Sequence, residues 1–158
     1  MDGAPRDGRD IAGGIAAGMV LVPEDRRGQG LVLGLSVQEN INLGYERMFA
    51  NALGLLGGGK EREKAGQFIK RLRIKTPGAA TPVNTLSGGN QQKIVLSRCI
   101  GRGARVFLLD EPTVGIDVAA RTEIYRLIQG LADEGAAVLV ASSDLTEILE
   151  ICSRIYVI

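Results

Sequence analysis

TLSGGNQQKIVLSRCIGRGARVFLLDEPTVGID, residues 85–117, contains two short patterns that suit phosphate chemistry. In the first, Ser87, Gly88 and Gly89 precede a helical pattern, so they would place a hydroxyl and bare backbone N–H groups at a helix N-terminus. Such N–H groups have no partner within the helix and carry partial positive charge, which favours an anion. Glycine also lets an anion approach the backbone closely, because it has no Cβ.

The second pattern is an apolar strand that ends in two carboxylates. Residues 106–109 read VFLL, which predicts a strand buried on both faces of a parallel sheet. Asp110 and Glu111 follow at its carboxyl end, where open α/β sheets bind ligands. Because side chains alternate along a strand, one carboxylate could hold Mg2+ through water while the other orients or deprotonates an attacking water.

The composition excludes several other kinds of site. The 158 residues suit one domain, and a hydrophobic content of 45% can supply its core. The sequence has no histidine, which excludes a Ser/His/Asp triad and any histidine-dependent metal site. A net charge of +1 and an aromatic content of 4% argue against nucleic-acid binding. Cys99 and Cys152 lie in apolar helical patterns and are expected to be buried, reduced thiols.

The order of the motifs resembles the ATP-binding cassette (ABC) ATPases. LSGGNQQK, LLDEPT and the GID of residues 115–117 are similar to that family's signature, Walker B strand and D-loop. The resemblance runs from about residue 18 to the last residue. It implies an α/β fold, a partial P-loop NTPase-like cassette with a mostly parallel sheet and an inserted helical subdomain. The form LSGGNQQK is similar to the second cassette of tandem-cassette importers of ribose, xylose or galactose.

The resemblance implies a role for each motif residue. The residues implied in ATP contact belong to the signature and D-loop: Ser87, Gly88, Gly89, Gln91 and Asp117. Asp110 and Glu24 would hold Mg2+, whereas Glu111 and Ser143 would act in hydrolysis. Glu24 replaces the glutamine of most cassettes, but a carboxylate can still bind a hard cation through water. Ser143 replaces a histidine, and its uncharged hydroxyl predicts weaker γ-phosphate sensing.

The remaining sequence predicts how the elements are arranged. Residues 18–35 would form a strand at 19–22 and the Q-loop region, 36–85 a helical subdomain and linker, and 86–158 the signature, Walker B, D-loop and switch region. Ser36 and Glu39 form a capping-box pattern, and Ala65, Phe68, Ile69 and Leu72 an apolar stripe. A helix is expected from residue 118, and strands at 137–141 and 155–158. Asp144 would cap a helix with Glu147 in a capping box and an apolar face of Leu145, Ile148, Leu149 and Cys152.

One stretch imitates a phosphate loop. Residues 54–60, GLLGGGK, satisfy GxxxxGK, but Glu61 follows where Ser or Thr must bind Mg2+, and no buried strand precedes them. A loop between helices is therefore expected. A phosphate loop supplies several charge-assisted hydrogen bonds, and losing three or four would cost roughly 5–10 kcal/mol. The chain is thus expected to be a fragment of a longer cassette protein and inactive alone.

The resemblance predicts an ATP-binding and ATP-hydrolysing subunit that powers import of a simple sugar. Its expected partners are a second ABC cassette, membrane permease subunits and, indirectly, a periplasmic sugar-binding protein, at the cytoplasmic face of the plasma membrane. No apolar run approaches the ~18 residues of a membrane span, so the membrane role would come through the permease. Two alternatives remain: an ATPase of a nucleoside-type importer, and a non-catalytic or nonfunctional cassette remnant. The intact Asp110 and Glu111 favour sugars over nucleosides.

Overall fold

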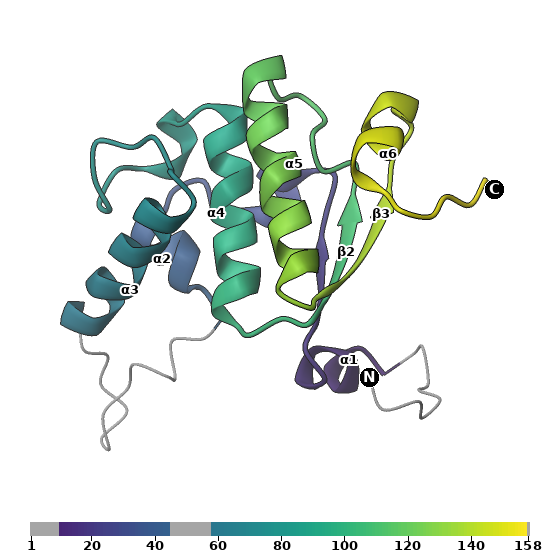
Figure 1. The fold of residues 1–158 in the computed structure, drawn as a ribbon. Helices are drawn as coiled ribbons and strands as arrows, with labels where there is room; N and C mark the ends of the chain where they lie inside the picture. The colour runs from purple at the N-terminus through teal and green to yellow at the C-terminus, as the bar shows by residue number, and fades with distance from the viewer. Residues whose placement is uncertain (1–9, 45–57, 158) are drawn as a thin grey trace.

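The computed structural model describes residues 10–44 and 58–157 of the chain. Most of the GLLGGGK stretch, residues 54–57, lies outside the described residues. The helices and strands, shown in Figure 1, are α1 (Ile11–Ala16), β1 (Met19–Val22), α2 (Val37–Asn42), α3 (Gly58–Arg71), α4 (Gly88–Gly101), β2 (Val106–Asp110), α5 (Val118–Asp133), β3 (Ala137–Ala141) and α6 (Leu145–Ile151). A π-helical turn at Arg26–Gly30 and a 3-10 turn at Val83–Thr85 complete the order.

The described strands form one parallel sheet in the order β1-β2-β3. Val22 of β1 pairs with Leu109 of β2, and Asp110 pairs with Ala141 of β3. In this register the three strands end at nearly the same level, so the loops that follow them leave from one edge of the sheet. The prediction of an α/β fold with a parallel sheet is confirmed.

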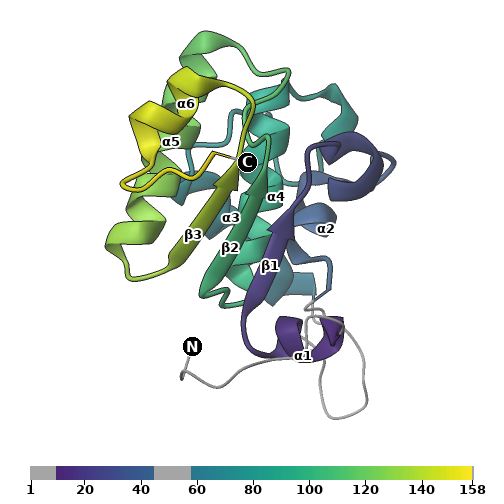
Figure 2. The same cartoon turned by 90° about the vertical axis from the view of Figure 1, so that its right-hand side faces the viewer.

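The two faces of the sheet differ in exposure. Helices α4 and α5 cover one face (Figure 1), and Phe107 and Leu109 of β2 are buried. On the other face, turned toward the viewer in Figure 2, Leu21 of β1 is 60% exposed and Leu139 of β3 is 63% exposed. In β2 itself, Val106 and Leu108 are only half-buried, so the expectation that residues 106–109 are buried on both faces is wrong for the described chain. An all-apolar strand sequence specifies two faces that favour burial, but not what covers them.

Helix α4 is the centre of the fold (Figure 1). It packs against α2, α5 and β1, and it buries Ile94, Val95, Leu96 and Cys99. The polar side chains 91–93 at its N-terminal half are buried as well. The buried surface of α4 therefore includes polar as well as apolar side chains, because neighbours surround the helix on several sides.

The helical segment before the signature contains two described helices. Ser36 and Glu39 form the predicted capping box at α2, with Ser36 N–H donating to Glu39 Oε2 at 2.8 Å and Glu39 N–H donating to Ser36 Oγ at 3.3 Å. The hydrogen bond from the Ser36 hydroxyl holds the pKa of Glu39 below its ordinary value. In α3, Ala65 and Phe68 are buried, and Leu72 just beyond it is buried as well. The predicted stripe is thus the core-facing side of α3.

The C-terminal segment departs from two predictions. Asp144 caps α6 as expected, but Glu147 does not complete a capping box, and Leu145 and Leu149 are exposed rather than part of an apolar face. Residues 155–157 form no strand, and Val157 is 95% exposed. A strand needs a ladder partner for its backbone groups, and this segment runs away from the sheet in Figure 1.

Candidate functional site

The carboxyl edge of the sheet carries the predicted metal-binding carboxylates. Asp110 is the last residue of β2 and is exposed, and Glu24 is exposed two residues beyond β1. Both are hard oxygen donors of the kind Mg2+ prefers. Within residues 10–44 and 58–157, no group of three or more His, Cys, Asp or Glu side chains could hold a metal ion. The carboxylates would therefore need water or phosphate oxygens to complete a Mg2+ shell.

Glu111 reaches from the end of β2 to the segment after β3. Its Oε1 accepts the backbone N–H of Ser143 at 2.6 Å, and its own N–H donates to Ala141 O at 2.9 Å. The φ angle of Glu111 is +42°, a strained value for a residue with a Cβ. The structure thus brings the two predicted hydrolytic residues together across 32 positions of sequence. Their contact uses the Ser143 backbone and leaves its hydroxyl out.

A buried polar contact below this edge ties α6 to the turn after β2. Thr113 Oγ1 donates to Glu147 Oε1 at 2.7 Å, and the Glu147 side chain is only 1% exposed. Burial raises the pKa of the neighbouring Tyr125, which also contacts Thr113 by a hydrogen bond. The sequence pattern predicted a capping-box role for Glu147 instead. The available signal was the spacing: Glu147 lies one helical turn before Ile151, so the two side chains share one side of α6.

The signature begins α4 and contacts the D-loop. Ser87 is the N-cap residue of α4 and is exposed. A Cβ on Gly88 would lie 2.8 Å from Gly115 O, and one on Gly89 would lie 2.6 Å from Ala120 Cβ. The two glycines are therefore required for close packing against the D-loop and α5. Close packing is thus a structural reason for the two glycines, in addition to the predicted approach of an anion.

A small polar hollow of about 90 Å³ lies beside the signature. Its lining includes residues of the signature, the D-loop and α5: Ser87, Gly89, Asn90, Lys93, Asp117, Ala120 and Glu123, with Lys75 and Ala119. Asp117 caps α5 by accepting the N–H of Ala120 at 3.0 Å. Gln91 does not line the hollow, because it is buried and donates to Val83 O at 3.1 Å. The neighbouring Asn90, which is not among the predicted site residues, lines it instead.

Arg26 connects the loop after β1 with the D-loop. Its Nη1 donates to Val114 O at 2.6 Å and its Nη2 to Gly115 O at 3.2 Å. Burial is the main cause that lowers the pKa of Arg26, and Arg27 adds to it. A guanidinium remains charged despite such a shift. The loop after β1, Gly115 and Gly88 therefore meet at this side chain.

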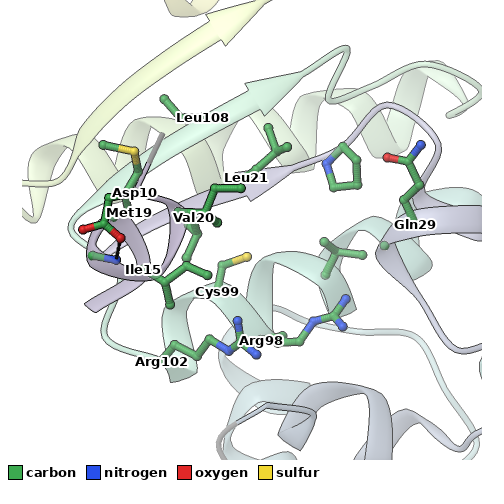
Figure 3. Close-up of a pocket in the computed structure, with 16 residues that line it drawn as sticks. Asp10, Ile15, Met19, Val20, Leu21, Gln29, Arg98, Cys99, Arg102 and Leu108 are labelled. Atoms are coloured by element: carbon green, nitrogen blue, oxygen red, sulfur yellow. Dashed lines mark hydrogen bonds between the residues drawn. The ribbon is translucent and has the colours of Figure 1, made fainter. Parts of the chain in front are cut away.

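A larger hollow lies elsewhere, at the edge of β1 that faces away from β2. It has a volume of about 750 Å³ and lies between α1, β1 and α4, with Ile15, Val20 and Cys99 among its lining residues (Figure 3). None of the nine predicted site residues lines it. Because polar and charged groups of three motifs converge at the sheet edge and the signature instead, those places are the stronger candidates for chemistry.

The described helices include none that is long and apolar enough to cross a membrane. This finding covers residues 10–44 and 58–157 only.

Comparison with known proteins supports the motif assignment. The chain is 50% identical to the "Ribose import ATP-binding protein RbsA" of Pseudomonas putida over 157 residues, which are 99% of this chain and 30% of that protein. It is 48% identical to the "Arabinose import ATP-binding protein AraG" of Azospirillum brasilense, over 98% of this chain and 29% of that protein. The chain thus spans about 30% of the length of these curated relatives.

Solved cassettes share the fold. The dimeric, post-hydrolysis structure of the ATP-binding cassette MJ0796 bound to ADP and Pi superposes with a TM-score of 0.64 and 25% identity, covering 82% of this chain and 53% of that one. A metal-chelate type ABC transporter in an inward-facing conformation gives a TM-score of 0.68 at 22% identity, over 85% of this chain and 52% of that one. The sequence model of the family described as "ABC transporter" matches residues 8–114, more than half of the chain. The chain belongs to the ABC transporter family.

Proposed function

We propose that this chain is the signature-bearing part of an ATP-binding cassette that powers import of a ribose- or arabinose-type sugar. The observation that carries the proposal is the intact signature at the head of α4 beside the D-loop, in a chain 50% identical to a ribose import ATP-binding protein. The second of two tandem cassettes is the proposed position, because LSGGNQQK resembles that cassette in sugar importers.

The proposed nucleotide contacts divide between two sites. Ser87, Gly88 and Gly89 contact the phosphates of an ATP molecule held by another cassette, with Asp117 beside them. The dimeric state of the similar MJ0796 cassette supports such a shared arrangement. Asp110, Glu111, Glu24 and Ser143, at the carboxyl edge of the sheet, serve this cassette's own nucleotide. Gln91 is the weakest of the proposed contacts, since its amide is buried and already bonded.

Mg2+ fits the residues at the sheet edge. Asp110 and Glu24 would hold it, and the ion would neutralise charge on the phosphate oxygens. Glu111 orients the attacking water in this proposal, and the hydrogen bond from the Ser143 N–H supports that role because it fixes the carboxylate. Ser143 acts through this backbone contact as well as through its uncharged hydroxyl.

The proposed partners follow from this role. A second cassette completes the nucleotide sites, membrane permease subunits carry the sugar, and a periplasmic sugar-binding protein delivers it. The cassette then works at the cytoplasmic face of the plasma membrane. An importer of nucleosides is the alternative from the same family, and a non-catalytic cassette is the alternative from another class.

The test uses the full-length ATPase to which this chain is proposed to belong, assembled with its membrane subunits. Ser87→Arg places a long cation in the signature hollow, and Glu111→Gln removes the carboxylate that orients water. Both variants should lower Mg-ATP hydrolysis by at least about a hundredfold, the usual loss when a transition-state contact or general base is removed. Uptake of labelled ribose or arabinose should fall in parallel.

Matched controls make the result specific. Asn84→Arg places the same cation on the exposed turn before the signature, and Glu150→Gln makes the same neutralisation on the exposed side of α6. Both should keep hydrolysis and uptake. Full hydrolysis by Ser87→Arg would refute the signature's role, and hydrolysis unaffected by Glu111→Gln would favour the non-catalytic alternative. Uptake of a labelled nucleoside but of no sugar would replace sugar import by nucleoside import.

A further inference from the structure

Asn90 lies between the segment before the signature and the hydroxyl of Ser87. The backbone N–H of Lys75 donates to Asn90 Oδ1 at 2.7 Å, and Asn90 Nδ2 donates to Ser87 Oγ at 2.8 Å. A backbone N–H can only donate a hydrogen bond, so the carbonyl oxygen of the Asn90 amide must face Lys75. The NH2 group must then face Ser87, and the direction of the second hydrogen bond is determined.

This direction fixes what the Ser87 hydroxyl can do. Because Ser87 Oγ accepts from Asn90, its own proton is not used in that bond and can be donated to another group. A serine at a helix N-cap ordinarily accepts a backbone N–H of the first turn, but Ser87 makes no such side-chain cap hydrogen bond. Its exposed hydroxyl therefore stands at the head of α4 as an oriented donor, beside backbone N–H groups that also point out of the helix end.

The anchor of Asn90 is itself held by α4. Lys93 Nζ, one turn further along the helix, donates to Arg73 O at 3.1 Å and pairs with Glu123. The segment 73–75 is therefore tied to α4 at two points, through Lys93 and through Asn90. A fixed Lys75 N–H keeps the Asn90 amide from turning over.

We infer that Asn90 is a positioning residue of the signature. It donates a hydrogen bond to Ser87 Oγ, so that the Ser87 hydroxyl donates its own hydrogen bond to a phosphate oxygen of ATP. The inference rests on the proposed function of the signature. Asn90 itself need not touch the nucleotide. Its effect passes through the orientation of one hydroxyl.

Asn90→Asp tests the direction of the hydrogen bond with almost no change of shape. The carboxylate still accepts a hydrogen bond from the Lys75 N–H, but it cannot donate one to Ser87. Instead it accepts a hydrogen bond from the Ser87 hydroxyl, which is then no longer available to the nucleotide. In the full-length ATPase with its membrane subunits, kcat/KM for Mg-ATP should fall about ten- to a hundredfold, the effect of losing one hydrogen bond to a charged group. Asn84→Asp adds the same charge on the exposed turn nearby and should leave kcat/KM within about twofold.

A double-mutant cycle separates positioning from structural support and from simple charge repulsion. Asn90→Ala removes the donor without adding charge, and it should lower kcat/KM when Ser87 is present. In a Ser87→Ala protein, the same change should have an effect of about twofold at most, because the hydroxyl that Asn90 orients is gone. An equal loss in both backgrounds would overturn the inference, as would unchanged activity of Asn90→Asp. If Ser87→Arg also leaves hydrolysis intact, the proposed function fails as well, which is a separate and recognisable outcome.

Discussion

Arg26 shows how one side chain can hold three motifs together. Its guanidinium donates to the carbonyls of Val114 and Gly115, while a Cβ on Gly88 would lie only 2.6 Å from Arg26 Nη2. The loop after β1, the D-loop and the signature therefore meet at this residue. In the sequence, Arg26 is one of several charges in a glycine-rich loop, and its hydropathy and spacing do not distinguish it from its neighbour Arg27.

Replacing Arg26 by lysine should destabilise the protein, whereas the same change at Arg27 should not. The compact ammonium of lysine lacks the planar fork that bonds both carbonyls, so Arg26→Lys should lower the free energy of unfolding by about 1–2 kcal/mol. Arg27→Lys, at an exposed position, should change it by less than about 0.5 kcal/mol. Urea unfolding followed by circular dichroism measures both free energies. Equal losses for the two variants would show that the hydrogen bonds of Arg26 to the two carbonyls do not stabilise the protein.

At the scale of elements, a charged contact joins α4, α5 and the segment after α3. Lys93 is 2% exposed and its Nζ lies 2.5 Å from Glu123 Oε2 and 3.1 Å from Arg73 O. The hydrogen bond from Lys93 is the main cause that lowers the pKa of Glu123. Because the folded pKa lies below the unfolded one, the pair stabilises the fold above the ordinary carboxyl pKa of about 4.3, and this contribution is lost as pH falls through the lower folded value.

Removing the carboxylate of this pair should therefore cost more than removing its buried ammonium. Glu123→Gln leaves a buried ammonium without its carboxylate and should destabilise the protein by about 1–3 kcal/mol, less than for a fully buried pair because Glu123 is partly exposed. Lys93→Met removes the buried charge and keeps the volume, and the Glu123 carboxylate that it leaves unpaired is partly exposed, so it should cost less. The difference between wild type and Glu123→Gln should shrink as pH is lowered.

The surface pair Arg71–Glu134 is the control for this prediction. Its side chains are 51% and 63% exposed, so Glu134→Gln should change the free energy of unfolding by less than about 1 kcal/mol. Urea unfolding of the wild type and the three variants, at pH 7 and at a pH below the ordinary carboxyl range, measures these differences. A Glu123→Gln loss that persists undiminished at the lower pH would contradict the assigned role of the Glu123 charge.

Elements with a local signal were predicted from the sequence, and long-range polar contacts were not. The strand at 19–22, the capping box of Ser36, and the start of α5 at residue 118 each depend on residues close in sequence. Glu147 was misassigned because its partner, Thr113, is 34 positions away. Asn90 and Arg26 were missed for the same reason, since their roles exist only once distant segments meet.

At the scale of the whole molecule, the sheet of the described residues has one covered and one uncovered face. The predicted motif residues lie at its carboxyl edge and near the head of α4, and residue type and order suffice to assign them to their motifs. What covers Leu21 and Leu139 could not be read from the strands, since apolar residues do not specify their partner. In the part of the chain that the structure describes, these side chains stay exposed.

The division of the nucleotide site leads to a prediction for the isolated 158-residue chain. The only GxxxxGK in its sequence is followed by Glu61, so no stretch combines the glycines and lysine with the Ser or Thr that binds Mg2+. Without the roughly 5–10 kcal/mol that three or four charge-assisted hydrogen bonds supply, its Kd for Mg-ATP should be at least about a thousandfold higher than that of the full-length ATPase. The sheet-edge carboxylates cannot replace these bonds, because they reach phosphate only through a cation.

Titration calorimetry on both proteins measures the ratio of the two Kd values, with ADP as a second ligand. Micromolar binding by the isolated chain would contradict the prediction and would mean that the signature, the D-loop and the sheet edge hold a nucleotide by themselves.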